Sequence, residues 1–168
     1  FADANAIAVG GLAGIGASLP TAVANGTSLA RMGGAVTGGA SLTISATGYS
    51  DADAEADASG GGLLSVQLPL AKAVASPTVR AYKDGSGNVN VTGNVSLSAV
   101  SDADADAVGK TVSIGAASVG ILQAEAETKP VVQTYVSGGT ITAGGSISLA
   151  AGHNTGPTAR TTSASSSA

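Results

Sequence analysis

Apolar and polar residues alternate one by one along several stretches of this chain. From Asp51 to Ala58 every even position is Ala, and the odd positions are acidic as far as Asp57. On a strand, this alternation places Ala on one face and the carboxylates on the other. Ala is the best helix former, but helical spacing would scatter the acids around the axis and leave no apolar stripe. Residues 88–92 and 145–149 alternate in the same way, so the pattern predicts β-strands.

A short phrase, in which a Gly-containing turn leads into a strand, occurs three times. Its copies are Thr37–Ala46, Thr92–Ala99 and Thr142–Ala150. Their spacing of roughly 50 residues is typical of a repeat architecture. We predict that the apolar positions of the three copies point inward, stack in register and form the structural core. These positions are Leu42, Val95 and Ile147 in one set, and Ile44, Leu97 and Leu149 in the other.

The same period extends over the whole chain. We divide the chain into repeats at about 2–50, 51–101 and 102–154, and residues 155–168 begin a further repeat. The acidic alternation opens the second and third repeats, and a reduced copy opens the first. Glycine pairs and other turn residues separate the short strands. The sequence therefore predicts a single segment, 1–168, made of similar units.

The composition favours a stack of short strands over a compact globular core. Hydrophobic residues make up 43% of the chain but aromatic residues only 2%, whereas compact cores usually draw on large side chains. We predict an all-β fold, a parallel β-solenoid (β-helix) of three repeats of about 50 residues. A β-sandwich is the alternative, and it would need more large core residues. The sequence leaves open whether each repeat makes one turn of the solenoid or two.

Charge and composition exclude several partners and sites. The net charge is −4 and the pI is about 4.6, so nothing is built to neutralise phosphates and we expect no nucleic-acid partner. No continuous apolar run of about 18 residues occurs, which predicts no membrane span. The chain has no Cys, which excludes disulfides and thiolate metal sites. It starts at Phe1, and we interpret it as a processed chain or part of a longer one.

The phrase Gly144–Ser148, the segment Arg80–Tyr82 and the acidic alternation from Ser50 to Ala54 recur together here. In this combination the chain resembles the repeats of bacterial filamentous haemagglutinin-type adhesins, and more closely those of leukotoxin-type filamentous adhesins. The resemblance covers nearly the whole chain. It implies a right-handed parallel β-helix that is secreted, exposed at the cell surface and filamentous. It brings no catalytic residues with it.

The acidic runs are the main candidate for local chemistry. If one repeat is one turn, Asp51 stacks beside Asp102 and Asp53 beside Asp104, and like charges across neighbouring strands are destabilising. Calcium, which takes 6–8 oxygen ligands, would relieve this repulsion. The alternative is a solvated acidic face that aids solubility and blocks sideways aggregation. We expect these four residues to be exposed in either case.

Other residues give weaker functional signals. His153 lies in a Gly- and Asn-containing turn without the context of a catalytic triad, and glycine-rich stretches such as 10–14 lack the Lys-Ser/Thr of a phosphate loop. We therefore predict no enzyme and no cofactor other than calcium. Tyr82 and Tyr135 follow a proline at the same distance, and they either make outward contacts to a neighbouring chain or glycan or cap a corner with the hydroxyl in water.

These features together predict a structural, non-enzymatic protein. We expect a segment or subunit of an extracellular or cell-surface filament, whose partner is itself. The stacking units are either separate chains placed head to tail or consecutive repeats of a longer chain, because uncapped solenoid ends propagate. The alternative is the repeat stalk of a bacterial adhesin that binds a host or surface ligand, with calcium as its stabilising ion.

Overall fold

The computed structural model describes residues 1–155 and 162–167 as an all-β protein with parallel sheets, which confirms the all-β part of the predicted fold class. None of the described sheets closes, and the β-solenoid stays a prediction. Strands make up 77% of the structure, and the described residues include no helix and so no apolar helix that could span a membrane. The strands are β1 (Ala2–Val9), β2 (Ala13–Ser18), β3 (Thr21–Ala24), β4 (Thr27–Met32), β5 (Val36–Gly39), β6 (Leu42–Ala75), β7 (Thr78–Lys83), β8 (Val89–Val91), β9 (Val95–Gly120), β10 (Gln123–Thr128), β11 (Val131–Val136), β12 (Ile141–Ala143), β13 (Ile147–His153) and β14 (Ser163–Ser167).

All pairings between the described strands are parallel. An eight-stranded sheet has the path β1-β6-β9-β13, with further strands beside β6 and β9. Two three-stranded sheets have the orders β11-β7-β4 and β12-β8-β5. Each three-stranded sheet therefore ends in a first-repeat strand on one side and a third-repeat strand on the other, with a second-repeat strand between them. In the eight-stranded sheet, β14 of the further repeat lies beside residues 106–110 of β9.

Paired residues lie about one repeat apart in the sequence. Hydrogen-bonded partners in neighbouring strands are separated by 51 residues at Ala103 and Asn154, by 52 at Asn94 and Ser146, and by 53 at Lys72 and Glu125. A whole repeat, rather than half of one, thus lies between neighbouring strands. The alternative that the sequence left open, in which neighbouring strands lie half a repeat apart, is thereby excluded for the described strands.

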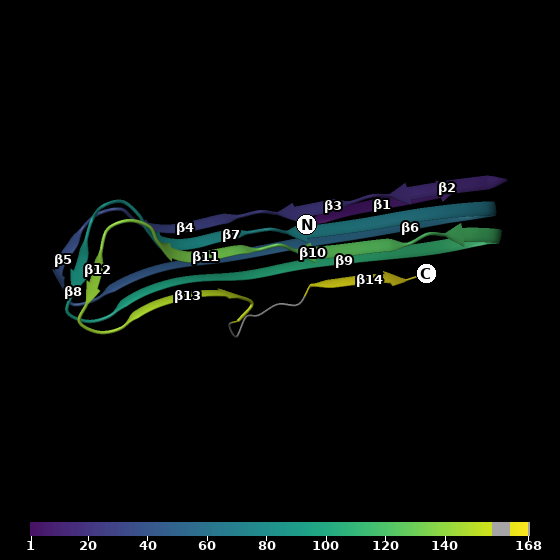
Figure 1. Ribbon diagram of the computed structural model, residues 1–168. Helices are drawn as coiled ribbons and strands as arrows, with labels where there is room; N and C mark the ends of the chain where they lie inside the picture. The colour runs from purple at the N-terminus through teal and green to yellow at the C-terminus, as the bar shows by residue number, and fades with distance from the viewer. Residues whose placement is uncertain (156–161, 168) are drawn as a thin grey trace.

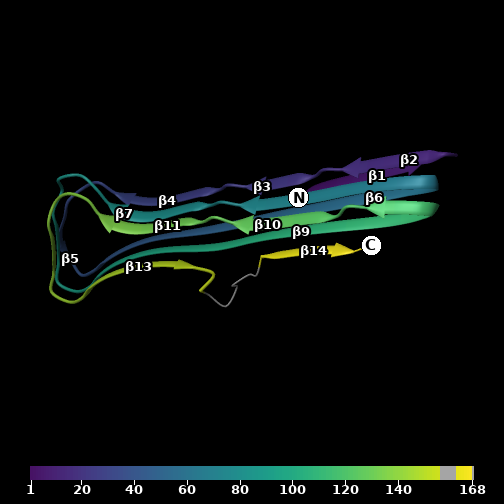
Figure 2. The ribbon, with the colours of Figure 1, turned by 45° about the vertical axis from the view of Figure 1, so that its right-hand side comes forward.

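Each repeat runs out along the molecule and then back, which gives the long flat body of Figures 1 and 2. From Leu42, near the end of the first repeat, the chain runs out along residues 42–62, which we call the outgoing arm, and it returns along residues 63–83 of the second repeat, the return arm. Gly62 lies at this reversal with a φ of 149°, which side-chain-bearing residues rarely adopt. At the opposite end, which we call the loop end, β5, β8 and β12 connect the arms (Figure 1).

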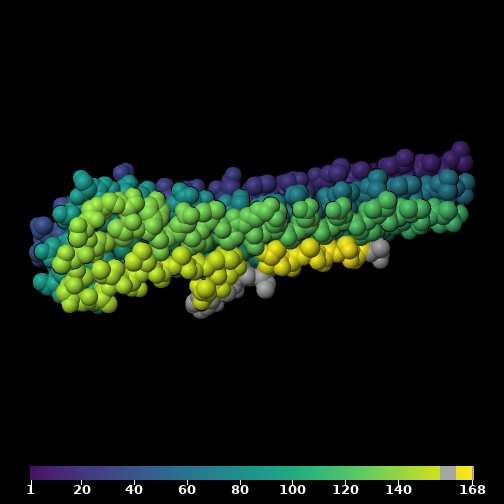
Figure 3. Space-filling view, viewed as in Figure 1, coloured from purple at the N-terminus to yellow at the C-terminus, as the bar shows by residue number. Residues whose placement is uncertain are grey.

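The interior between the two arms changes in character along the molecule. Near the loop end it holds larger aliphatic side chains, among them Val79, Val89 and Leu97. In the middle it consists of Ala alone, with Ala52, Ala54 and Ala56 of the outgoing arm in one cluster with alanines of the return arm. Toward the reversal, buried Ser65 and Gln67 replace the apolar residues. The space-filling view in Figure 3 shows the resulting thin, elongated body.

The six predicted core residues occupy two columns across the sheet. Leu42 pairs with Val95 and Val95 with Ile147, while Ile44 pairs with Leu97 and Leu97 with Leu149, which is the register in which the three phrases align. Val95 and Leu97 are fully buried, Ile44 is 7% exposed, and Leu42 is partly buried. Ile147 and Leu149 are 49% and 46% exposed, which corrects the expectation of a buried position. They lie in β13, the last strand of the sheet, where no further described strand covers them.

Candidate functional site: an acidic face and two open edges

The outward side of the outgoing arm carries most of the acidic residues, and we call it the acidic face. In β6 and β9 these residues alternate with buried alanines, because successive side chains of a strand point to opposite sides. Lys110 and Asn5 lie among them, each opposite Asp57. The acidic members of the face are Asp3, Asp51, Asp53, Glu55, Asp57, Asp102, Asp104 and Asp106.

The pairing of the acidic residues differs from the predicted one by two positions. Asp51 lies opposite Asp104 and Asp53 opposite Asp106, whereas Asp102 lies opposite Tyr49. The expected pairs, Asp51 with Asp102 and Asp53 with Asp104, are therefore wrong. The reason is that the apolar phrase sets the register upstream at Leu42 and Val95, and no bulge intervenes before the acidic run. Like charges still meet across the strands, but in different pairs.

The acidic candidates are also less exposed than expected. Asp51, Asp53 and Asp102 are half-buried, and Asp104 is only 7% exposed. The Tyr49 hydroxyl donates to Asp51 Oδ2 at 3.1 Å. Among the described residues no three His, Asp or Glu side chains form a group that could hold a metal ion. Calcium binding by Asp51, Asp53, Asp102 and Asp104 thus stays a prediction.

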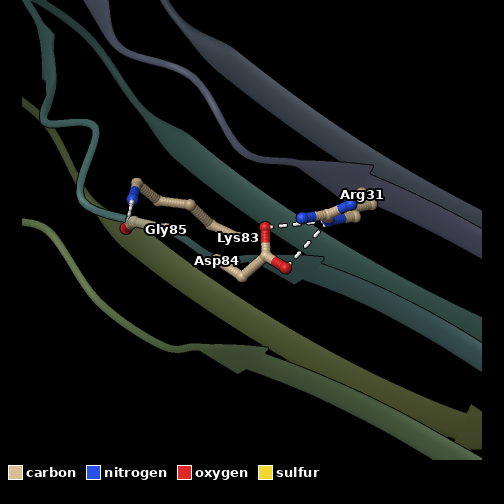
Figure 4. A network of polar contacts seen from close by, with 4 residues as sticks. All are labelled: Arg31, Lys83, Asp84 and Gly85. Carbon is tan, nitrogen blue, oxygen red and sulfur yellow. Dashed lines mark hydrogen bonds and ion pairs between the residues drawn. The ribbon is translucent and has the colours of Figure 1, made fainter.

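Ion pairs connect successive repeats on the outer surface. Lys110 bonds Glu55, and Lys72 Nζ lies 2.8 Å from Glu125 Oε1, in each case one repeat away. The hydrogen bond and the charge of the glutamate raise the pKa of each lysine. Arg31 Nε donates to both carboxylate oxygens of Asp84, at 2.9 and 2.8 Å, and this contact raises the pKa of the guanidinium (Figure 4).

The loop end holds a buried lysine, Lys83. The Lys83 side chain is fully buried, and its Nζ donates to the carbonyl oxygens of Gly138 at 2.9 Å and of Gly85 at 3.4 Å. Figure 4 shows it reaching Gly85 beside the Arg31–Asp84 pair. A Cβ on Gly139 would lie 2.7 Å from this Nζ, so glycine makes room for the ammonium group. The lysine thereby joins the loops of two successive repeats.

Asparagine side chains make similar connections at the turns. Asn94 Oδ1 accepts hydrogen bonds from the backbone N–H of Ser146 at 2.9 Å and from its hydroxyl at 3.2 Å. Asn88 Oδ1 accepts from the N–H of Thr140 at 2.9 Å. In both cases the side chain satisfies a backbone donor of the next repeat, which would otherwise need water. These contacts fix the register at positions where the strands are short.

The remaining sequence candidates have structural contacts. Tyr82 and Tyr135 stack on one another, with ring centroids 4.8 Å apart and an angle of 12° between the rings, so each contacts the neighbouring repeat of the same chain. His153 lies at the end of β13, with Nδ1 3.1 Å from the carbonyl oxygen of Ser101. Nothing in this arrangement brings His153 together with a nucleophile.

An apolar outer surface at the reversal end was missed by the sequence analysis. Ile7, Val9, Val112 and Ile114 are 73%, 87%, 62% and 76% exposed. From the sequence we assigned inward positions only in the three recurrent phrases and made no prediction for this stretch. The parity of the acidic run applies to it, because the even alanines of β1 face inward and leave the odd Ile7 and Val9 outside. Following that parity through the Gly-rich segment would have found this surface.

Both edges of the stack are open among the described residues. Residues 42–53 of β6 pair with β9 on one side, and no described strand pairs with their other side. At the opposite edge β13 pairs with β9 alone. Comparisons with protein-family models, with curated proteins and with solved structures find no match to this chain. The functional argument therefore rests on the geometry.

Proposed function

We propose that this protein is a structural, non-enzymatic segment of a filament, built as a parallel β-solenoid that continues beyond one copy. The observation that carries the proposal is the register. Leu42, Val95 and Ile147 form one column, and the edge strand β13 repeats the sequence pattern of the opposite edge at residues 42–46. Another copy can add its Leu42 beside Ile147 in the pairing that the chain already uses twice, provided that β14 leaves its place beside β9. That place is needed by β1 of the added copy, which pairs with residues 54–61 of its own β6.

Two general rules support the details of this proposal. The connection from β6 to β9 leaves a strand, crosses to the other wall and returns to a parallel neighbour in the same sheet. Such crossovers are right-handed in about 98% of cases, so a right-handed solenoid is favoured. An open strand edge also presents backbone N–H and C=O groups that need partners, which a further copy supplies.

The unpaired donors can be assigned to individual residues. In a parallel pair, a residue directs its N–H and C=O to one neighbour, and the next residue directs them to the other side. The N–H of Leu42 donates to Asn94 and that of Asn154 donates to Ser101. By this alternation, the N–H of Leu149 points to the open side of β13 and the N–H of Ser45 to the open side of β6.

The experiment removes one open edge at a time. Proline lacks the donor and is tolerated on an edge strand whose N–H faces away from the sheet. We expect threads of the parent protein in electron micrographs, and no threads for Leu149→Pro or Ser45→Pro. Leu149→Val and Ser45→Ala keep the donor and serve as matched controls that still form threads. Threads of either proline variant as long as those of the parent would show that this edge is not the joint.

A mixture of the two proline variants separates edge blocking from misfolding. Leu149→Pro retains the intact open edge of β6, and Ser45→Pro retains the intact open edge of β13. Mixed at equal concentrations, they should form a particle of two chains and grow no further. If both variants stay monomeric in the mixture while their circular dichroism is that of the parent, end-to-end assembly is refuted.

The extracellular, cell-surface location is part of the proposal and draws on the resemblance to filamentous adhesins. The stalk of an adhesin is the second candidate. It is favoured by β14, whose Ser163 pairs with Asp106 and so continues the stack within one chain. Both candidates use the same packing between repeats. They differ in that a stalk needs no contact between chains and would remain monomeric with intact edges.

A further inference from the structure

The reversal end has an inverted distribution of polarity. Its interior holds Gly14, Gly16, Ser65 and Gln67, and both amide atoms of the fully buried Gln67 have no hydrogen-bond partner. Its exterior is aliphatic, with each of the following residues 54–87% exposed: Ile7, Val9, Leu12, Ile15, Leu63, Leu64, Val112, Ile114 and Val119. This part of the molecule therefore gains little from burying its own interior, and covering its outside would bury far more apolar surface.

The outgoing side of this end is a groove. Across the three repeats, Ile7, Ser59 and Val112 form one row, and Val9, Gly61 and Ile114 form the next. Small residues of the middle strand thus lie between two aliphatic ridges, which stand about 10 Å apart because each strand spacing is about 4.8 Å. The hollow has a volume of about 230 Å³ and includes Gly60 in its floor.

The return side of the same end carries a matching projection. Leu64, 58% exposed, lies in the middle strand, and its neighbours in the adjoining strands are Ala13 and Ala117. One branched side chain thus stands between two small ones, the reverse of the arrangement in the groove. Sheets that pack face to face do so at a separation of about 10 Å with interdigitating side chains.

Charge selects which sides can meet. Two outgoing sides facing one another would bring the acidic faces together, and such juxtaposition of like charges is costly. The return side has balanced charges, with Lys72 paired to Glu125, Lys129 to Glu127 and Arg31 to Asp84. An outgoing side can therefore face a return side without this repulsion.

We propose that the reversal end is a lateral interface between copies of this chain, in which Leu64 of one copy occupies the groove of another. The nine aliphatic side chains expose roughly 600 Å² if each offers about 100 Å² when fully exposed. Such an area reaches the upper limit of the largest patch on a typical monomer. Shared between two sides, it falls below the ~800 Å² per partner of a standard interface. Lateral contacts of single chains are accordingly weak, and they add up along stacked copies.

The test is site-directed cross-linking, which detects weak contacts. The chain has no Cys, so single-cysteine variants are unambiguous. Both partners carry Leu149→Pro, which blocks end-to-end stacking, so that this test and that of the filament can fail separately. A disulfide needs Cα atoms within about 7 Å, closer than packed sheets usually lie, so a short bis-maleimide is used. Chains with Ala117→Cys, which keep Leu64 and carry the thiol beside it, are mixed with affinity-tagged Ser59→Cys chains.

We expect the mixed Ala117→Cys/Ser59→Cys product to form at least tenfold faster than either homodimer or the control pair Leu29→Cys/Ser59→Cys. Leu29 is 56% exposed on the return side but lies away from the reversal end. Adding Ile114→Glu to the Ser59→Cys chain should abolish the excess. Rates equal to the control, or homodimers in excess, would overturn the proposal. Loss of the mixed product on adding phosphatidylcholine vesicles would assign the groove to a lipid surface instead.

Discussion

Alanine sets the thickness of the molecule in its middle section. Ala54, Ala73 and Ala105 are at most 2% exposed and belong to a cluster without any larger side chain. Two walls that meet through methyl groups alone lie close together, and close-packed interiors leave no room for additional atoms. The Ala residues are thus required by their small size.

We expect Ala105→Leu to destabilise the protein by about 1–3 kcal/mol, because added methylene groups force apart two walls that are already in contact. The measurement is the free energy of unfolding in denaturant. Ala150→Leu is the matched control, since Ala150 is exposed on the edge strand β13. A loss for Ala105→Leu no larger than that for Ala150→Leu would show that the middle section has room to spare.

At the scale of the element, each strand is joined to the next repeat by side chains as well as by its backbone. Lys110 and Glu55 connect β9 to β6, and Lys72 and Glu125 connect β6 to β10. The backbone hydrogen bonds alone allow a strand to slip by two residues while keeping its inward side inward. Charged pairs in fixed columns oppose such a slip, although each exposed pair contributes little stability.

These pairs give an expected dependence on pH. The pKa values of Lys72 and Lys110 are raised from 10.5 in the folded protein. Their contribution to stability is therefore complete below that pH and is lost as the pH rises through the folded pKa. The melting temperature of Lys72→Met/Lys110→Met should fall less than that of the parent above pH 10.5.

The control for this experiment is Lys129→Met. Lys129 pairs with Glu127, only two residues away, and the unfolded chain can form that contact as well. Its pH profile should follow that of the parent. Identical profiles for the double variant and Lys129→Met would mean that the pairs between repeats contribute nothing to stability at alkaline pH.

At the scale of the whole molecule, one long side is acidic and one end is apolar. The acidic face places Asp53 directly opposite Asp106, a pairing of like charges that costs stability. It also discourages two acidic faces from meeting. The proposed filament grows along the stacking direction and the proposed lateral contact forms at the reversal end, so the acidic face remains free for solvent.

Asp53→Asn tests whether this face is solvated or binds calcium. Without calcium, we expect the substitution to raise stability by about 0.2–1 kcal/mol, because it removes one of two opposed charges. If the face is solvated, millimolar calcium leaves the gain unchanged after correction for ionic strength. If Asp53 is a calcium ligand, the variant becomes less stable than the parent in calcium. Asp84→Asn, which breaks the pair with Arg31, should lower stability in both conditions.

The sequence by itself determined the strands, the period and the alignment of the repeats. Alternation from Asp51 to Ala58 leaves no helical stripe, and each of the three phrases presents its two apolar residues at the same points. The columns through Val95 and Leu97 follow from this alignment. Such features are local, because they depend only on the two-residue period of a strand and on the recurrence of the turn.

Only the tertiary structure decided how many residues separate neighbouring strands, which acidic residues pair across them, and on which side Ile7 and Ile114 lie. The separation of one whole repeat between neighbouring strands follows from the pairing of β6 with β9, which no local pattern encodes. Asp51 lies opposite Asp104 because hydrophobic packing at Leu42 and Val95 sets the register, and the acidic residues follow that register although it pairs like charges. The inverted end arises because side-chain parity continues from the alanine section through the strand, whatever the size of the residues that follow.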